Sequence, residues 1–359
     1  MKRLVGLIAI AGALSCRERA AEPDPTPQAT TTASTSLPVP VAKVVDGQFG
    51  AMGTSITFKI WTDREVAARA AMEDALAEIK RIEAMMTTWS ETSEVSKINA
   101  AAGGAPVPVS PELIDVLDGA RAIHDASEGV FDITFYGLKG LWKFDEDMTN
   151  DIPSEAAIKE RLPLVDGSKV MIDHAAHTVT LAKKGMAINL GGIAKGYAVD
   201  RAAAVLAKNG FTDVVVQAGG DLLVKGRKGE AAWTVGIRDP RGPIDDFFAL
   251  APIVDASFST AGDYERAFVK DGKRYHHILD PRTGHPATAC RSVTVLAKDA
   301  LTADELDDAV FILGPEKGLP LIEARDGVGA VIVTADNKVI VSKRLQGKLT
   351  FVHPPTAGI

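Results

Sequence analysis

The chain of 359 residues has little cysteine and no excess of positive charge. Its two cysteines, Cys16 and Cys290, cannot form a disulfide framework, and an internal disulfide is excluded if Cys16 carries a lipid. A formal net charge of −7 gives no basic surface for the phosphate backbone of nucleic acids. With 46% apolar and 24% charged residues, the chain must instead be stabilised by an ordinary hydrophobic core.

The N-terminal apolar run, Leu4 to Leu14, is too short to cross a bilayer as a permanent helix. It follows Lys2 and Arg3, which is the layout of a signal peptide. The run ends at Ala13-Leu14-Ser15-Cys16, which resembles a bacterial lipobox, whose cysteine is lipid-modified and becomes the new N-terminus. We predict a lipoprotein signal peptide over residues 1–16; a plain secretory signal is the alternative. The expected location is the bacterial cell envelope, at the periplasmic face of a membrane.

The next segment, residues 17–43, is rich in Pro, Thr, Ser and Ala and has almost no large apolar side chain. Such a segment cannot bury enough surface to fold, so we predict a disordered tether. It could hold a domain off a membrane by on the order of a few nanometres. The remainder, residues 44–359, shows no clear internal boundary and no short tandem repeat, so we treat it as one domain.

This domain mixes strand and helix patterns and is therefore predicted to have an α+β fold. Alternation over Ser55 to Ile60 predicts a strand, and helical spacing of apolar residues over Arg64 to Met85 predicts a helix. Further strands are expected at Lys169 to Ile172, Thr178 to Ala182, Val214 to Gln217, Leu222 to Lys225, Trp233 to Ile237 and Ser292 to Leu296. Further helices are expected at Pro111 to Glu128, Gly196 to Asn209 and Ala303 to Leu313.

A double-glycine turn lies in the segment Ala187 to Asp200, where an apolar strand passes through Gly191 and Gly192 into an amphipathic helix. Adjacent glycines let backbone amides approach an anion, the helix N-terminus adds a favourable dipole, and Lys195 adds a positive charge. The pattern is neither a Walker A loop nor a complete dinucleotide fingerprint. Spacing alone leaves a phosphate cradle and a turn built only for packing equally open.

An acidic helix start follows at Ala300 to Ala309, where Thr302 is predicted to cap the helix and Glu305 to complete a capping box. Asp304 and Asp308 are four residues apart on one face, so their repulsion costs roughly a few tenths of a kcal/mol. A hard cation between them would remove that cost. Spacing alone favours a solvated helix start over a metal site.

Two adjacent histidines, His276 and His277, lie near Asp280 and Arg282, just before a Pro-x-x-Gly turn. On a strand, one histidine would face each side. The simplest interpretation is a hairpin with a satisfied core histidine. A zinc site is disfavoured because no third soft ligand has suitable spacing.

Together these motifs resemble the ApbE-type flavin transferases, the FAD:protein FMN transferase family. The resemblance covers essentially Gly50 to Thr334, with the motifs in the family's order. The motifs are Met52 to Thr54, Gly129 to Thr134 with Leu141-Trp142, Gly191 to Ala198, Ser259 to Tyr264, His277 to Gly284 and Phe311 to Gly314.

The resemblance implies a T-fold-like α+β domain of two related halves, with FAD in the central cleft and Mg²⁺ as the metal. It also implies transfer of FMN from FAD, through a phosphoester, to a threonine or serine hydroxyl of an acceptor flavoprotein, with release of AMP. Two alternatives stay open: an FAD pyrophosphatase that yields FMN and AMP, and an FAD-binding lipoprotein without turnover.

The resemblance also implies roles for single residues, carried over by position. Met52 and Trp89 would flank the flavin, and Ile278 would lie near its ring. Asn189 and Lys195 would contact FAD. The nucleotide cleft would be lined by Val130, Phe131 and Asp132.

For magnesium, the resemblance implies a backbone carbonyl at Gly192, a carboxylate at Asp304, a backbone group at Asp307 and a side chain at Asp308. His277 and Asp263 are the candidates for proton transfer and for organising the cleft. Two positions depart from the family pattern, which more often has aspartate at Asn189 and threonine at Asp308. One negative charge is lost and one gained, so the local charge is expected to stay similar.

Overall fold

The computed structural model describes residues 41–144 and 148–359. By its internal contacts the chain divides after Val39, and the described residues belong to the second unit, Pro40–Ile359. The predicted signal peptide, Cys16 and nearly all of the predicted tether lie outside the described residues. In the part of the chain that is described, no helix combines the length and the apolar character needed to cross a bilayer.

An antiparallel sheet of eight strands forms the centre of this unit, in the order β1-β2-β6-β7-β10-β15-β16-β17. Each half supplies a pair of strands, then helices, then a second pair, and the halves meet where β7 pairs with β10. The strands are β1 (Lys43–Ala51), β2 (Thr54–Thr62), β6 (Val214–Ala218), β7 (Asp221–Lys225), β10 (Ala256–Gly262), β15 (Cys290–Ala297), β16 (Gly329–Thr334) and β17 (Val339–Val341).

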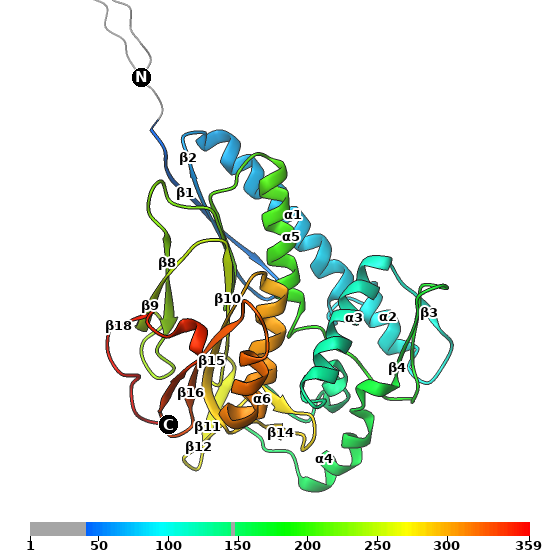
Figure 1. Cartoon of the computed structure of the whole chain (residues 1–359). Coiled ribbons are helices and arrows are strands. Elements are labelled where there is room, and N and C mark those ends of the chain that lie inside the picture. The colour runs from blue at the N-terminus through cyan, green and yellow to red at the C-terminus, as the bar shows by residue number, and fades with distance from the viewer. Residues whose placement is uncertain (1–40, 145–147) are drawn as a thin grey trace, which may run out of the picture. The chain divides into compact units, whose positions relative to one another are not determined.

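Three helices cover one face of this sheet: α1 (Glu65–Met86), α5 (Ala194–Lys208) and α6 (Ala300–Glu323) (Figure 1). The main core lies between them and the sheet. The alternation predicted for β2 explains its place there, because Ile56, Phe58 and Ile60 are all fully buried. Burial of each such side chain contributes about 1.5–3 kcal/mol.

A smaller sheet packs on the opposite face, in the order β18-β9-β8 (Figure 1). Its strands are β8 (Trp233–Arg238), β9 (Phe247–Ile253) and β18 (Thr350–Phe351). A second core fills the space between the two sheets and includes Val224, Phe248 and Val331.

The remaining elements lie beyond the helical layer and around one end of the central sheet (Figure 1). The helices there are α2 (Glu94–Ala100), α3 (Pro111–Ala126), η1 (Ile133–Leu138), α4 (Glu155–Arg161), η2 (Leu162–Leu164) and η3 (Gly167–Lys169). The strands are β3 (Val107–Pro108), β4 (Val170–Asp173) and β5 (Thr178–Leu181), with two hairpins, β11 (Ala267–Lys270) with β12 (Lys273–His276) and β13 (Leu279–Asp280) with β14 (His285–Pro286). A last turn, η4 (Lys343–Leu345), precedes β18.

The α+β prediction is confirmed, and the predicted strands and helices match observed ones with shifts of a few residues, except that α6 continues past a kink at Gly314 to Glu323, well beyond its predicted end at Leu313. The predicted cap of α6 is wrong. The helix begins at Ala300, and Asp299 caps it by accepting a hydrogen bond from the Thr302 amide at 2.9 Å. Asp200 of α5 accepts from the Ala300 and Leu301 amides as well. These earlier acceptors satisfy the free amides, so Thr302 and Glu305 lie inside the helix.

Candidate functional site

The double-glycine turn leads into α5, whose first turn packs against the start of α6. Asn189 shapes it by accepting a hydrogen bond from the Gly191 amide at 2.7 Å. Gly196, in the first turn of α5, allows a very close approach: a Cβ atom there would lie 2.3 Å from the Ala300 carbonyl oxygen. The Gly196 amide donates to Oδ2 of Asp304 at 2.8 Å. The glycine pattern therefore places an acidic turn of α6 beside this loop.

Three buried carboxylates meet at this point, Asp221 from the start of β7 and Asp304 and Asp307 from α6, with one oxygen of each within 4.8 Å of the others. Lys195 joins two of them, with its Nζ 2.5 Å from Asp221 and 3.0 Å from Asp304. Ser259 of β10 hydrogen-bonds both Asp221 and Asp307, the latter at 2.6 Å.

Asp308 adds a fourth carboxylate beside the glycine turn. Its Oδ2 lies 2.6 Å from where a Cβ atom on Gly192 would be, so its carboxylate packs directly against that glycine. We call Asp221, Asp304, Asp307 and Asp308 the carboxylate cluster. The structure thus brings together all four residues predicted as metal ligands, and it adds Asp221 and Ser259.

The carboxylate cluster concentrates negative charge around Lys195. The ammonium lies within hydrogen-bonding distance of Asp221 and Asp304, and its charge also acts on Asp308. Burial, with the charge of the neighbouring carboxylates, raises the pKa of Asp304 to about 7 and that of Asp307 well above its ordinary value. Burial also raises the pKa of Asp308 to about 6, although Lys195 opposes the shift. For Lys195, burial disfavours the charge, but Asp221 and Asp304 outweigh it and raise the pKa.

These residues fit a hard divalent cation. Ser259 has a single hydroxyl hydrogen and lies between two carboxylate oxygens, so one of them needs a proton or a cation. Oxygen ligands from several carboxylates are what Mg²⁺ and similar ions prefer. A bound cation would also relieve the mutual repulsion that raises these pKa values.

The two histidines have different environments. His276 is a core residue: its Nε2 lies 2.8 Å from the Ala287 carbonyl oxygen, its Nδ1 accepts from the Ile278 amide, and its ring packs edge-on against Phe311. His277 follows the end of β12, and its buried Nδ1 has no partner among the described residues. Burial lowers the pKa of His277 to about 3, and repulsion from His276 and from nearby cations, including Lys195, adds to this effect. Its imidazole is therefore neutral at physiological pH.

Asp263 lies at the end of β10, where Arg241 holds it firmly. The guanidinium donates to both carboxylate oxygens, at 2.6 and 2.7 Å, and both side chains are buried. Because both oxygens are engaged, the geometry favours the organising role predicted for Asp263 over proton transfer. Arg241 was not predicted.

Met52 and Trp89, which we call the rim residues, lie in segments that adjoin the turns of the site. Met52 and Gly53 form the two-residue turn between β1 and β2, and this turn lies close to the β6–β7 turn: a Cβ on Gly219 would be 2.8 Å from Oγ1 of Thr54. The Trp89 side chain is 84% exposed. Its neighbour Thr88 accepts a hydrogen bond from the Asn189 side chain at 3.4 Å. The rim residues thus adjoin the turns that carry Asp221 and Gly192.

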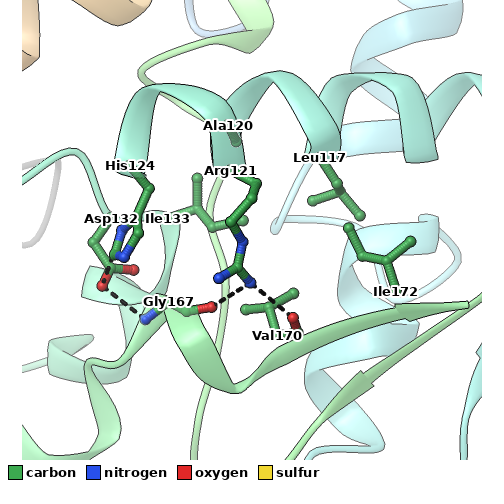
Figure 2. Close-up of a pocket in the computed structure, with 9 residues that line it drawn as sticks. All are labelled: Leu117, Ala120, Arg121, His124, Asp132, Ile133, Gly167, Val170 and Ile172. Atoms are coloured by element: carbon green, nitrogen blue, oxygen red, sulfur yellow. Dashed lines mark hydrogen bonds and ion pairs between the residues drawn. The ribbon is translucent and has the colours of Figure 1, made fainter. Parts of the chain in front are cut away.

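The segment predicted to line the nucleotide cleft divides in two. The Phe131 ring faces the glycine turn, 3.3 Å from the Cβ position of Gly192, while Val130 is buried. Ile278, predicted to lie near the flavin ring, is buried as well. Asp132 instead faces a small pocket under α3, where it accepts from the Gly167 amide and lies near His124 (Figure 2). A more open groove of about 350 Å³ adjoins it and is also lined by Lys183 and Arg282.

Sequence reasoning missed Asp221, although the glycine pair Gly219 and Gly220 before it marks a sharp turn next to an acidic residue. It reached Ser259 only as part of a motif. Arg241 carried no local signal, because its partner Asp263 is 22 residues away in the sequence.

Comparison with known proteins places these features in a family. Residues 52–332 match the model of the ApbE family. A FAD:protein FMN transferase of Klebsiella pneumoniae (strain 342) is 33% identical over 292 residues, covering 81% of this chain and 89% of that protein. The FAD:protein FMN transferase of Treponema pallidum (strain Nichols) is 34% identical over 307 residues, covering 81% and 84%.

Solved structures agree with these sequence matches. The ApbE protein of Thermotoga maritima superposes with a TM-score of 0.77 at 33% identity, covering 85% of this chain and 99% of that one. The flavin transferase ApbE from Vibrio cholerae superposes with a TM-score of 0.75 at 26% identity, covering 85% and 99%.

Proposed function

Because the chain belongs to the ApbE family, we propose that it is an FAD:protein FMN transferase that attaches FMN to a threonine or serine hydroxyl of an acceptor flavoprotein and releases AMP. The observation that carries the proposal is the carboxylate cluster beside the glycine turn, with Lys195 next to it. A cation site beside amides and an ammonium suits a pyrophosphate substrate.

Magnesium is the cation that we propose for this site. Asp304 and Asp308, the Gly192 backbone and Asp307 would hold it, with Asp221 as an added ligand that the sequence did not indicate. Bound there, Mg²⁺ supplies charge neutralisation of the pyrophosphate and Lewis acidity at phosphorus.

The protein's own residues have three tasks in the reaction. Lys195 and the Gly192 amide bind the negative pyrophosphate, whereas the Gly191 amide already donates to Asn189. The acceptor hydroxyl oxygen bonds to the phosphorus of the FMN half, the bond from that phosphorus to the bridging oxygen breaks, and AMP leaves with that oxygen. His277 would accept the hydroxyl proton at Nδ1, which has no hydrogen-bond partner among the described residues. With a pKa of about 3 the ring is a weak base, so this role requires the negative charge of a bound pyrophosphate to raise that pKa. If water replaces the hydroxyl, the same step gives FMN and AMP.

The test is to incubate the purified protein with FAD, Mg²⁺ and a threonine-bearing acceptor domain and to weigh the acceptor by mass spectrometry. The proposal expects an acceptor heavier by one FMN residue, and no change with EDTA or with Asp304→Ala. Asp74→Ala is the matched control, because Asp74 is exposed on α1. Free FMN and AMP with an unchanged acceptor would instead indicate a pyrophosphatase.

A second candidate, an FAD-binding protein without turnover, is favoured only by the two departures from the family pattern, Asn189 and Asp308. Asp308→Thr separates the cases. A gain of transfer would mean that the natural carboxylate impairs the site, whereas a loss would identify the carboxylate as a working ligand.

We also propose that Cys16 is lipidated and anchors the domain at the periplasmic face of a membrane. The proposal rests on the lipobox-like Ala13-Leu14-Ser15-Cys16 and the short apolar run before it. Metabolic labelling with palmitate tests it: we expect label on the wild-type chain and none on Cys16→Ser.

A further inference from the structure

We infer that Glu83 is a positioning residue that holds Met52 in the conformation needed to contact the flavin ring. The inference rests on the proposed function, because it takes flavin as the ligand. It is carried by one hydrogen bond between distant parts of the chain, in which Oε1 of Glu83 accepts from the Met52 amide at 2.7 Å.

Met52 has an unusual backbone conformation. Its φ is +54° and that of Gly53 is +67°, so both residues of the β1–β2 turn are in the left-handed region. Two-residue hairpin turns of this kind favour asparagine, aspartate or glycine at the first position. Methionine there is held in a conformation that costs free energy, and such residues concentrate at ligand-binding sites.

Glu83 is unfavourable at its position in its own helix. It lies in the last turn of α1, which ends at Met86 and has no basic residue in that turn. A carboxylate at a helix C-terminus is opposed by the helix dipole. The short hydrogen bond to the Met52 amide offsets this cost, because an ionised acceptor makes a strong bond. The sequence thus keeps an unfavourable carboxylate at the helix end, where a contact with a distant residue compensates for it.

The last turn of α1 also supports Trp89, the second rim residue. The backbone carbonyl of Glu83 accepts from the Thr87 amide at 2.9 Å, and Oγ1 of Thr87 accepts from the Trp89 amide at 3.1 Å. The end of α1 thus supports both Met52, through the Glu83 side chain, and Trp89, through the backbone. Only the first link depends on the identity of residue 83.

The experiment compares ligands that do and do not contain the flavin ring. Affinities for FMN and for AMP are measured separately by fluorescence quenching and calorimetry, in Mg²⁺, for wild type, Glu83→Ala and Glu83→Gln. Loss of a hydrogen bond to a charged acceptor predicts that Glu83→Ala weakens FMN binding about tenfold. AMP binding should change less than about twofold, and Glu83→Gln, which keeps an acceptor oxygen, should retain most FMN affinity.

Two controls separate positioning from general support of the fold. Glu73→Ala removes an exposed carboxylate from the same helix and should leave both affinities unchanged. The double variant Glu83→Ala with Met52→Ala should bind FMN little worse than Met52→Ala alone, because Glu83 acts through Met52. Additive losses, or equal losses for FMN and AMP, would overturn the inference.

Failure of the proposed function can be distinguished from failure of the inference about Glu83. A wild-type protein that binds FMN but transfers none refutes the transferase and leaves the Glu83 comparison intact. A wild-type protein that binds no flavin overturns both.

Discussion

Replacing Lys195 by methionine is the sharpest test of the charge balance in the site. The ammonium lies 2.5 Å from Asp221 and 3.0 Å from Asp304. Methionine keeps much of the chain length and removes the charge. The variant removes this positive charge from the carboxylate cluster, so its free energy of unfolding should fall.

The size of the loss follows from the burial of the pair. Removing one partner of a buried ion pair costs about 3–5 kcal/mol, because the other charge stays buried and uncompensated. The Lys195 side chain is 31% exposed, so we expect a loss at the lower end of this range. Protonation of the carboxylates softens this loss, since burial raises the pKa of Asp304 to about 7 and that of Asp308 to about 6. The full loss is therefore expected near pH 8 and a smaller one near pH 5.

Magnesium should restore part of this loss. A ligand at 100 times its dissociation constant stabilises the folded state by about 2.7 kcal/mol. The gain should be larger in Lys195→Met than in wild type, because the cluster is more negative without the ammonium. Urea unfolding at pH 8, with EDTA and with Mg²⁺, measures both gains.

Lys208→Met, at an exposed position near the end of the same helix, is the matched control. A loss below about 1 kcal/mol in EDTA would contradict this account of the ion pair. Equal Mg²⁺ gains in the variant and in wild type would show that Lys195 and the cation do not share the same carboxylates.

Two further predictions concern a glycine of the site and an ion pair elsewhere in the domain. Gly196→Ala should lower the free energy of unfolding by about 1–3 kcal/mol and weaken Mg²⁺ binding, measured by urea unfolding and calorimetry, because the new Cβ would lie 2.3 Å from the Ala300 carbonyl oxygen and 2.8 Å from Cβ of Asp304. Hydrogen bonds to the Pro354 carbonyl and to Asp246 raise the pKa of His353. The wild type should therefore be more stable than His353→Gln below pH 6.5, with the difference shrinking as pH rises to 8.5; a constant difference in urea unfolding would argue against this ion pair.

Local sequence patterns predicted the regular elements of the fold well. The strand predicted at Ser55 to Ile60 lies inside β2, because alternation decides which side chains face the core. The helix predicted to end at Leu313 is interrupted next to that residue, since Gly314 has a φ of +74° and Pro315 follows. The predicted cap of α6 failed because Asp200 and Asp299 accept hydrogen bonds from the amides of Ala300, Leu301 and Thr302, so the helix already begins at Ala300.

The site could be predicted only in part, because its members come together through sheet pairing. Asp221 starts β7, and Ser259 lies in β10, which pairs with β7 at Phe258 and Leu222. No spacing in the sequence indicates that pairing. The Arg241–Asp263 pair likewise depends on how the loop after β8 folds back over the end of β10. The resemblance located Asp304 and Asp308 without revealing the charge that surrounds them.

The two departures from the family pattern, Asn189 and Asp308, contact different parts of the glycine turn. The negative charge gained at Asp308 therefore does not take the place of the one lost at Asn189. Asn189 accepts from the Gly191 amide and donates to Thr88, which is a structural task that an aspartate could share only in its accepting part. Asp308 instead packs against Gly192, and its charge helps to raise the pKa of Asp304 and Asp307. Negative charge is therefore moved from the loop to the helix. A cation bound there would be attracted toward α6, which makes Asp308 a stronger determinant of metal affinity than a threonine at that position would be.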